Sequence, residues 1–297
     1  MNKSFTLIEI LVVIVVIGVL SAFILVGMSS ISNSANIAKG QAFANSLRNS
    51  LLINLISEWK LDESTGVTAI KDSWGTNNGT LTCTDGDCWK GYSDCVNGNC
   101  LYFSDNDNVD IPHADNMEFG SGNYTISLWF KPSDSLVHTR DIVTRRENVD
   151  ATVDIFSLYR SVSNSRIYFV VRNGGSAVQS VSSTIACEEN KFCQAVITKS
   201  SSIKIYINGV DVSQSASVTG DVPDFTTSFK IGANDGYYGY PFKGFIDDVK
   251  IFNETISTYN IWQEYFIGLN KLLINSSIYV EEFNQRFSEF SGSLADN

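Results

Sequence analysis

The chain has 297 residues, of which 18% are charged, and its formal net charge is -11 at pH 7. Residues 1–57 hold three basic residues and one acidic residue, so the rest of the chain carries -13. Binding to a nucleic-acid duplex requires clustered Lys and Arg, and this acidic balance therefore excludes a duplex as the expected ligand. Calcium, sugars and other proteins are compatible with it.

The first predicted element is an apolar helix over residues 5–28, which follows the short head 1–4 and contains one acid, Glu9. It is long enough to span a membrane, and Lys3 at its short end predicts that this end lies inside the cell. A carboxylate in hydrocarbon costs about 2.5 kcal/mol, so Glu9 needs a partner, which a free amino terminus at Phe5 would provide. A plain anchor and a secretory signal are the alternatives, but the run exceeds the roughly 7 to 15 residues of a signal core.

The head and the start of this helix, Lys3-Ser4 followed by Phe-Thr-Leu-Ile-Glu at residues 5–9, resemble the type IV prepilin motif. The family implies a leader over residues 1–4, cleavage by prepilin peptidase between Ser4 and Phe5, and methylation of the new terminus. It also implies that Glu9 pairs with the amino terminus of a neighbouring pilin subunit during filament assembly. Ser4 departs from the Gly that the family usually has.

Helical spacing continues beyond the membrane run, where apolar residues recur every four positions at Phe43, Leu47, Leu51 and Leu55. The prepilin resemblance implies a single long N-terminal helix, the pilin stem, over residues 5–57, with its second half packed on a globular domain. A flexible stalk rich in Ser and Asn over residues 29–36 is the alternative.

Six cysteines form three close pairs, and each of the first two pairs encloses a polar turn of four residues. An even number of cysteines in an exported chain predicts disulfides, although spacing alone cannot choose the connectivity. A zinc site is the alternative, but no C-x2-C occurs and neither histidine lies near the cysteines. The candidate disulfide residues are Cys83, Cys88, Cys95, Cys100, Cys187 and Cys193.

From residue 58 onward, short runs of β-branched and aromatic residues alternate with clusters of Gly, Asn, Asp and Ser. This pattern predicts a mainly β fold, an antiparallel β-sandwich jelly roll. Hairpin turns with positive φ are expected at Asn173-Gly174, Asn208-Gly209 and Asp235-Gly236. The clearest strand runs cover residues 124–130, 167–171, 195–198 and 203–207.

A series of ordered motifs resembles the concanavalin A-like, laminin G-like jelly-roll family over roughly residues 56–266. The resemblance implies a β-sandwich domain at residues 58–256. At residues 191–196 the chain has Lys-Phe-Cys-Gln-Ala-Val where many relatives place a Trp-His pair. The motifs lie at residues 59–63, 72–75, 78–81, 101–105, 124–132, 205–209 and 243–252.

The jelly-roll resemblance also implies a structural calcium ion that ties the first strand to the last. The matching acids are Asp62, Asp72, Asp247 and Asp248. Calcium takes about 6 to 8 oxygen ligands, which acids joined by sheet pairing can supply. The alternative is that these acids cap turns and face water.

A tyrosine-rich loop is the most ligand-like part of the sequence. Aromatic faces stack on the C–H surfaces of sugars, and nearby amides and carboxylates bind hydroxyl groups, so this loop predicts a glycan or surface-protein ligand. The alternative is a hairpin whose tyrosines cover the sandwich edge. The candidate ligand-binding residues are Asn234, Asp235, Tyr237, Tyr238 and Tyr240.

The C-terminal extension, residues 257–297, has apolar residues at helical spacing and predicts two short amphipathic helices broken near residues 275–277. They are expected to pack on the sandwich or the stem.

Catalysis is not expected, because the closely spaced carboxylate triplet E-x-D-x-E that related glycosidases use does not occur.

Together, the two resemblances imply a type IV pilin-like minor or tip subunit with a lectin-like head for adhesion. Such a subunit is a single-pass protein of the inner, cytoplasmic membrane before assembly and then lies in a pilus on the surface of a bacterium or related prokaryote. One alternative is a pseudopilin of a type II secretion or DNA-uptake system. Another, from a different class, is a membrane-tethered glycan-active enzyme.

Overall fold

The computed structural model describes residues 53–104, 106–133, 139–146, 155–172, 178–214, 221–222, 225–232 and 240–295. The chain divides into two units, Met1–Ile53 and Asn54–Asn297, and the account below concerns the second. The predicted membrane run, with Ser4, Phe5 and Glu9, lies outside the described residues. Neither helix among the described residues is long and apolar enough to cross a bilayer.

One boundary of the predicted stem is wrong. Residues 55–57, expected at the end of the helix, belong to strand β1 (Leu55–Trp59). Leu55 pairs with Phe252, and every residue of β1 is buried, so its apolar residues serve sheet packing rather than a helical stripe.

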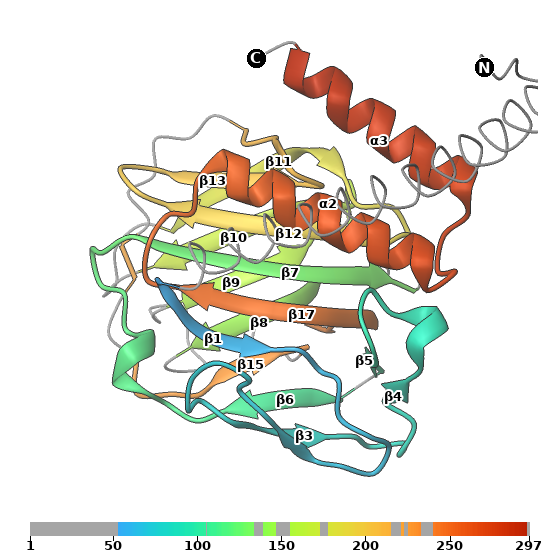
Figure 1. Ribbon diagram of the computed structural model, residues 1–297. Helices are drawn as coiled ribbons and strands as arrows, with labels where there is room; N and C mark the ends of the chain where they lie inside the picture. The colour runs from blue at the N-terminus through green and yellow to red at the C-terminus, as the bar shows by residue number, and fades with distance from the viewer. Residues whose placement is uncertain are drawn as a thin grey trace, which may run out of the picture. The chain divides into compact units, whose positions relative to one another are not determined.

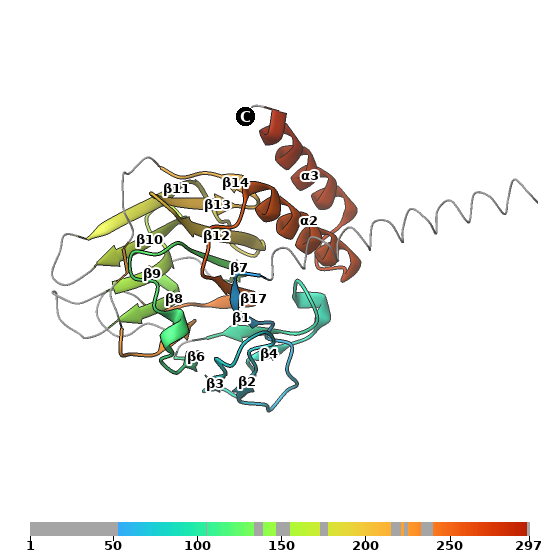
Figure 2. The ribbon, with the colours of Figure 1, turned by 60° about the vertical axis from the view of Figure 1, so that its left-hand side comes forward.

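Within the described residues, two sheets stack face to face as a sandwich, as predicted (Figures 1 and 2). Sheet A has the strand order β14-β13-β12-β7-β17-β5-β4, and β1 pairs with β17. Its remaining strands are β4 (Trp89–Lys90), β5 (Cys100–Phe103), β7 (Tyr124–Pro132), β12 (Cys193–Lys199), β13 (Ile203–Ile207), β14 (Val210–Asp211) and β17 (Gly244–Phe252).

Sheet B has the order β11-β10-β9-β8-β15-β6-β3-β2, and β16 pairs with β8 in parallel. Short 3₁₀ turns, η1 (Tyr92–Asp94) and η2 (Asp115–Met117), lie in the connections. The strands of sheet B are β2 (Ala69–Ile70), β3 (Gly79–Thr82), β6 (Asn108–Ile111), β8 (Arg140–Arg146), β9 (Ile155–Arg160), β10 (Arg166–Arg172), β11 (Gln179–Ala186), β15 (Phe229–Ile231) and β16 (Tyr240–Pro241).

Alternating side chains of the two sheets form the core between them. In β10, Ile167, Phe169 and Val171 are buried, while the residues between them are half-buried on the opposite face. Trp59 of sheet A stacks on Phe229 of sheet B with ring centroids 6.0 Å apart. The strand runs read from the sequence are confirmed as β7, β10, β12 and β13.

The hairpin predicted at Asn208-Gly209 is also confirmed. Their φ values are 51° and 82°, and the flanking residues Ile207 and Val210 pair across β13 and β14. Two successive positive φ angles belong to a tight turn that matches the twist of the strands. The turns expected at Asn173-Gly174 and Asp235-Gly236 lie outside the described residues.

Two C-terminal helices follow the last strand, α2 (Thr258–Ile274) and α3 (Val280–Ala295), as predicted. Ser257 caps α2, because its side-chain oxygen accepts a hydrogen bond of 3.2 Å from the amide of Asn260. Helix α2 lies on the outer face of sheet A (Figure 1), where Tyr265 stacks on Trp129. Sheet B lies on the far side of the sandwich from α2.

Two of the three expected disulfides are present. The Cα atoms of Cys83 and Cys88 are 5.9 Å apart, and those of Cys95 and Cys100 are 5.5 Å apart, within the usual range of roughly 4.4–6.8 Å. Each bond closes one of the four-residue turns that the sequence predicted.

The third expected disulfide is not formed, and Cys187 and Cys193 are buried thiols. Different neighbours hold their backbones: Cys193 begins β12 and pairs with Phe130, whereas the amide of Cys187 donates to the carbonyl of Ser165. Burial raises the pKa of the Cys187 thiol, and a hydrogen bond with Cys193 raises it further.

Candidate functional site

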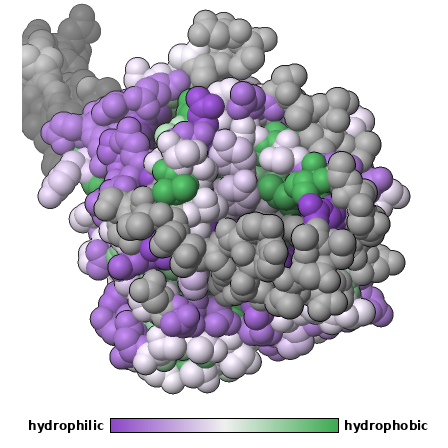
Figure 3. Space-filling model, turned by 180° about the vertical axis from the view of Figure 1, so that it is seen from behind, coloured by the Kyte–Doolittle hydropathy of each residue, from purple (hydrophilic) through white to green (hydrophobic). Residues whose placement is uncertain are grey.

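The outer face of sheet B, the face turned away from the sandwich core, gathers polar and aromatic side chains. On β9, Phe156 and Leu158 point into the core, so Ser157 and Tyr159 lie on the outer face. Ser157 Oγ donates a hydrogen bond of 2.8 Å to Asp141 Oδ1, which places Asp141 on the same face. Figure 3 views the molecule from this side, where the described surface is mostly hydrophilic and carries a few separate hydrophobic patches.

Two tyrosines form an aromatic pair on this face. Tyr159 of β9 and Tyr168 of β10 are directly opposite in the register, and their rings stack with centroids 5.2 Å apart and 2° between their planes. Burial raises the pKa of Tyr159 to about 12, with further contributions from Tyr168 and Asp141. Asp141 lies opposite Tyr159 in β8, so a carboxylate stands beside the aromatic pair. Sequence reasoning missed this pair, because only the strand register brings residues 159 and 168 together.

The predicted tyrosine loop starts and ends beside the same strand. The amide of Gly232 donates a hydrogen bond of 2.8 Å to Ile142 O, where the chain leaves sheet B. The chain returns at β16, in which Tyr240 pairs with Arg140 and Pro241 with Asp141. The loop is therefore joined to sheet B next to Asp141. Four of its predicted ligand-binding residues, Asn234, Asp235, Tyr237 and Tyr238, and the side chain of Tyr240 lie outside what the structure describes.

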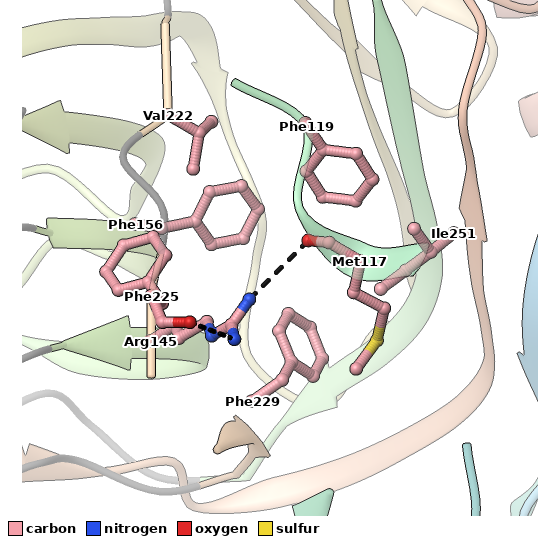
Figure 4. Close-up of a pocket in the computed structure, with 8 residues that line it drawn as sticks. All are labelled: Met117, Phe119, Arg145, Phe156, Val222, Phe225, Phe229 and Ile251. Atoms are coloured by element: carbon pink, nitrogen blue, oxygen red, sulfur yellow. Dashed lines mark hydrogen bonds between the residues drawn. The ribbon is translucent and has the colours of Figure 1, made fainter. Parts of the chain in front are cut away.

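A small apolar cavity lies between the sheets around Arg145, whose side chain points into the sandwich (Figure 4). Arg145 forms an ion pair of 2.6 Å with Glu118 and donates to the carbonyls of Phe225 and Thr227. The cavity volume is about 10 Å³, room for about one water molecule. This arginine therefore closes the end of the core, and the cavity is too small for a sugar.

The carboxylate of Asp72, one of the four predicted calcium ligands, accepts hydrogen bonds from backbone amides. Its Oδ1 accepts hydrogen bonds from the amides of Glu58, Trp74 and Gly75, and its Oδ2 accepts one from the amide of Asn77. These bonds tie the turn after β2 to β1. Its contacts do not join it to the other three acids.

Asp62, Asp247 and Asp248 meet where the turn after β1 approaches β17 and the Cys95–Cys100 loop. Asp247 is fully buried, and its Oδ2 accepts hydrogen bonds from the amides of Val96 and Asn97. Its Oδ1 is buried without a hydrogen-bond partner. Burial raises the pKa of Asp247 well above its usual value, and the charges of Asp248 and Asp62 add to this effect.

The backbone explains how two adjacent acids reach this place. The register between β17 and β7 shifts between Asp247 and Lys250, and Asp248 has a φ of 49°, so a bulge interrupts the strand alternation. Asp62 Oδ1 accepts a hydrogen bond of 2.9 Å from the amide of Asn99. A buried, unpartnered carboxylate oxygen close to other acids has the chemistry of a calcium ligand set.

The tightest group of metal-ligand atoms among the described residues lies elsewhere, at Cys83, Asp85, Cys88 and Asp107, whose atoms lie within 4.8 Å of one another. Its two cysteines form a disulfide, and Asp107 accepts hydrogen bonds from Thr84 and Ser104. This group is therefore not a ligand set. The oxygens of Asp62, Asp247 and Asp248 do not converge as closely, so a calcium ion there would also need carbonyl or water oxygens.

A model of the concanavalin A-like lectin/glucanases superfamily matches residues 103–261, more than half of the chain. The chain belongs to this superfamily. A model of the prokaryotic N-terminal methylation motif matches residues 1–25 of the same chain. Both resemblances read from the sequence are thereby confirmed, and this concanavalin A-like chain carries an N-terminal segment of the pilin type. No match is found among curated proteins.

Several solved structures share the concanavalin A-like fold of this chain. The binding domain of Paraclostridial Mosquitocidal Protein 1 aligns with a TM-score of 0.56 and 16% identity, over 74% of this chain and 53% of that chain. Trypanosoma rangeli sialidase in complex with sialic acid aligns with a TM-score of 0.53 and 13% identity, over 71% of this chain and 32% of the sialidase.

A third structure is domain 4 of a GH43 extracellular arabinanase from Geobacillus stearothermophilus, in complex with arabinotriose. It aligns with a TM-score of 0.50 and 19% identity, over 71% of this chain and 97% of that domain. The chain spans about a third of the length of the sialidase and about half of the toxin binding domain. At these identities, the likenesses establish the fold alone.

Proposed function

We propose that this protein is a type IV pilin-like subunit, in a minor or tip position, whose sandwich is a glycan-binding head for surface adhesion. The observation that carries the proposal is the combination in one chain of a methylation motif at residues 1–25 and a lectin-like domain at residues 103–261. Prepilin peptidase cleaves between Ser4 and Phe5, and Glu9 pairs with the terminus of the next subunit in the filament. A head of this size would crowd a shaft, which favours a minor or tip position.

Binding without catalysis is the proposed role of the head. The stacked Tyr159 and Tyr168 offer aromatic surface, and the buried hydrogen bond between Ser157 and Asp141 holds the neighbouring strands in place beside them. The chain enters and leaves the tyrosine loop beside this surface. The toxin neighbour is a binding domain, and the sialidase and arabinanase neighbours hold sugars. These neighbours support a sugar-binding use of the fold.

Asp247 Oδ1, which is buried without a hydrogen-bond partner, supports the proposal of a structural calcium ion in the head. Asp62, Asp247 and Asp248 would hold it, and the ion would neutralise the buried carboxylate of Asp247 where β1, β17 and the Cys95–Cys100 loop meet. Asp72, which the sequence included in this set, would remain a backbone-binding residue.

Terminal-peptide mass spectrometry on sheared filaments and on membranes from the native cells tests the filament role. The expected result is a peptide that begins with N-methylated Phe5 in the sheared fraction. A chain that retains Met1 and occurs only in membranes would overturn the pilin assignment and leave a tethered sandwich. Glycan binding by the full-length protein in detergent, without release of sugar, tests the head separately.

A further inference from the structure

Arg146 is a buried cation with unsatisfied donors on the outer face of sheet B. Only 7% of the residue is exposed, and its Nε and Nη1 are buried without any hydrogen-bond partner. Within the part of the chain that the structure describes, Arg146 forms no ion pair. Its neighbour Arg145 points into the sandwich and is fully paired, so the two adjacent arginines have opposite roles.

A second unsatisfied group lies next to Arg146. Thr144 precedes it by two residues on β8, so both side chains share the outer face. Thr144 is fully buried, and its Oγ1 has no hydrogen-bond partner. Buried polar groups in proteins are nearly always hydrogen-bonded, and an orphaned one indicates a missing water, ion or ligand. Two such groups on one strand and one face indicate a single missing partner rich in acceptor oxygens.

Arg146 has a second arginine close by on the same face, although the protein as a whole is acidic. Arg146 and Arg172 pair with the same residue of β9 from opposite sides, which places their Cα atoms about 10 Å apart on one face. Lys230 of β15 pairs with Thr144, and its Nζ lies 3.8 Å from Asp110 Oδ2, so this acid offsets its charge. Two arginines, Arg146 and Arg172, therefore lie on one face of a chain whose net charge is -11.

A bound water could accept hydrogen bonds from these donors, but it would leave the buried charge uncompensated. A buried guanidinium is stabilised by an anionic acceptor, because the charge-assisted hydrogen bonds offset the loss of hydration. The carboxylate or sulfate of an acidic sugar supplies both the charge and several acceptor oxygens. The stacked Tyr159 and Tyr168 lie farther along the same strands, where a sugar ring of the same ligand would stack.

We infer that the outer face of sheet B binds an anionic glycan, and that Arg146 and Thr144 bind its acidic group, a carboxylate or a sulfate. This inference rests on the proposed glycan-binding function and specifies the class of glycan. Arg172 lies beside Arg146 on this face, and Arg146 makes the direct contact.

The test compares binding of the full-length protein in detergent to immobilised hyaluronan, dextran sulfate and dextran at about 150 mM salt. Hyaluronan presents carboxylates only, dextran sulfate presents sulfates only, and dextran is neutral. Variant Arg146→Gln removes the buried charge. Variant Arg166→Gln is the matched control, because Arg166 lies on the same face of β10 and its removal changes the net charge equally.

The expected result is tighter binding to at least one acidic polymer than to dextran. Binding to that polymer should weaken about tenfold or more in Arg146→Gln and change less than about twofold in Arg166→Gln. The preferred polymer identifies carboxylate or sulfate as the recognised group. Equal losses in both variants would mean unspecific attraction and would overturn the inference.

Binding to dextran alone would also overturn the inference, while the proposed glycan-binding function would stand. Binding to none of the polymers, with N-methylated Phe5 found in filaments, would overturn the anionic ligand and leave the filament role intact. If Arg146→Gln does not fold, Thr144→Val serves as the second variant, because it keeps the side-chain shape and removes the orphaned hydroxyl. An unchanged affinity of a folded Thr144→Val for the acidic polymer would then overturn the inference.

Discussion

Tyr265 of α2 stacks on Trp129 of β7, with ring centroids 5.7 Å apart and planes 14° apart. This contact joins the C-terminal extension to sheet A and covers the outer face of that sheet with a helix. It leaves the opposite sheet as the side on which a ligand face can form.

The close approach of α2 to Trp129 requires Gly268. A Cβ atom added there would overlap the Trp129 indole, so Gly268→Ala should lower the free energy of unfolding by about 1–3 kcal/mol despite the better helix propensity of Ala. Urea unfolding measures the change. Gly292 of α3 is the control, because an added Cβ meets nothing within 4 Å, and Gly292→Ala should stabilise by up to about 1 kcal/mol. Equal stabilisation by both changes would contradict the packing account.

Asp107 should make the head sensitive to acid. Desolvation disfavours its charged form, but hydrogen bonds from Ser104 and Thr84 outweigh desolvation and hold the pKa of Asp107 below its usual value. A lowered native pKa stabilises the fold above the unfolded-state pKa, and this contribution is lost as the pH falls through the native value. Asp107→Asn should therefore cost about 1–3 kcal/mol at pH 7 and progressively less below about pH 4.

Urea unfolding of the wild-type protein and Asp107→Asn at several pH values checks this dependence. The exposed Asp87, which pairs with Lys90, is the control, and Asp87→Asn should change stability by less than about 1 kcal/mol. A cost of Asp107→Asn that is the same at pH 3 and pH 7 would contradict the proposed role of its charge.

Calcium should stabilise the head through Asp247. Millimolar calcium should raise the Tm of the wild-type protein after treatment with a chelator, because an ion that binds the folded state alone stabilises it. Asp247→Asn should abolish this rise. Asp72→Asn should lower the Tm, because four backbone amides lose a charged acceptor, but it should keep the response to calcium. A calcium response lost in Asp72→Asn and kept in Asp247→Asn would reverse the two assignments.

Two of the six cysteines should be free thiols. When the protein is denatured without reductant and treated with iodoacetamide, Cys187 and Cys193 should be alkylated, while the cysteines of the other two pairs should not. Peptide mapping by mass spectrometry reads this pattern directly. A linked pair of peptides containing Cys187 and Cys193 would instead establish a third disulfide.

Glu9 should be required for filament assembly and dispensable for membrane insertion. Loss of its carboxylate in Glu9→Ala removes the partner of the neighbouring amino terminus and makes the apolar run easier to insert. Quantitative immunoblotting of sheared and membrane fractions should find the variant in the membrane alone. Normal amounts in the sheared fraction would show that the carboxylate has no role in assembly.

Local patterns in the sequence were enough to predict much of this fold. Strand runs such as residues 203–207, the Asn208-Gly209 turn and the two C-terminal helices depend on residues near one another in the chain. The same holds for the disulfides Cys83–Cys88 and Cys95–Cys100, each of which closes a short turn. The two family resemblances rest on local motifs as well, and both are confirmed.

Only the tertiary structure decided which distant residues meet. Asp62 lies close to Asp247 because β1 pairs with β17, whereas Asp72 has four backbone amides as partners. Tyr159 meets Tyr168, and Arg146 is left without an acceptor, because register and packing determine the surroundings of each side chain. Periodicity tells which face a residue takes, but it carries no information about which far strand becomes its neighbour. The sequence by itself therefore determined the elements and the family, and the packing of the sheets determined the candidate sites.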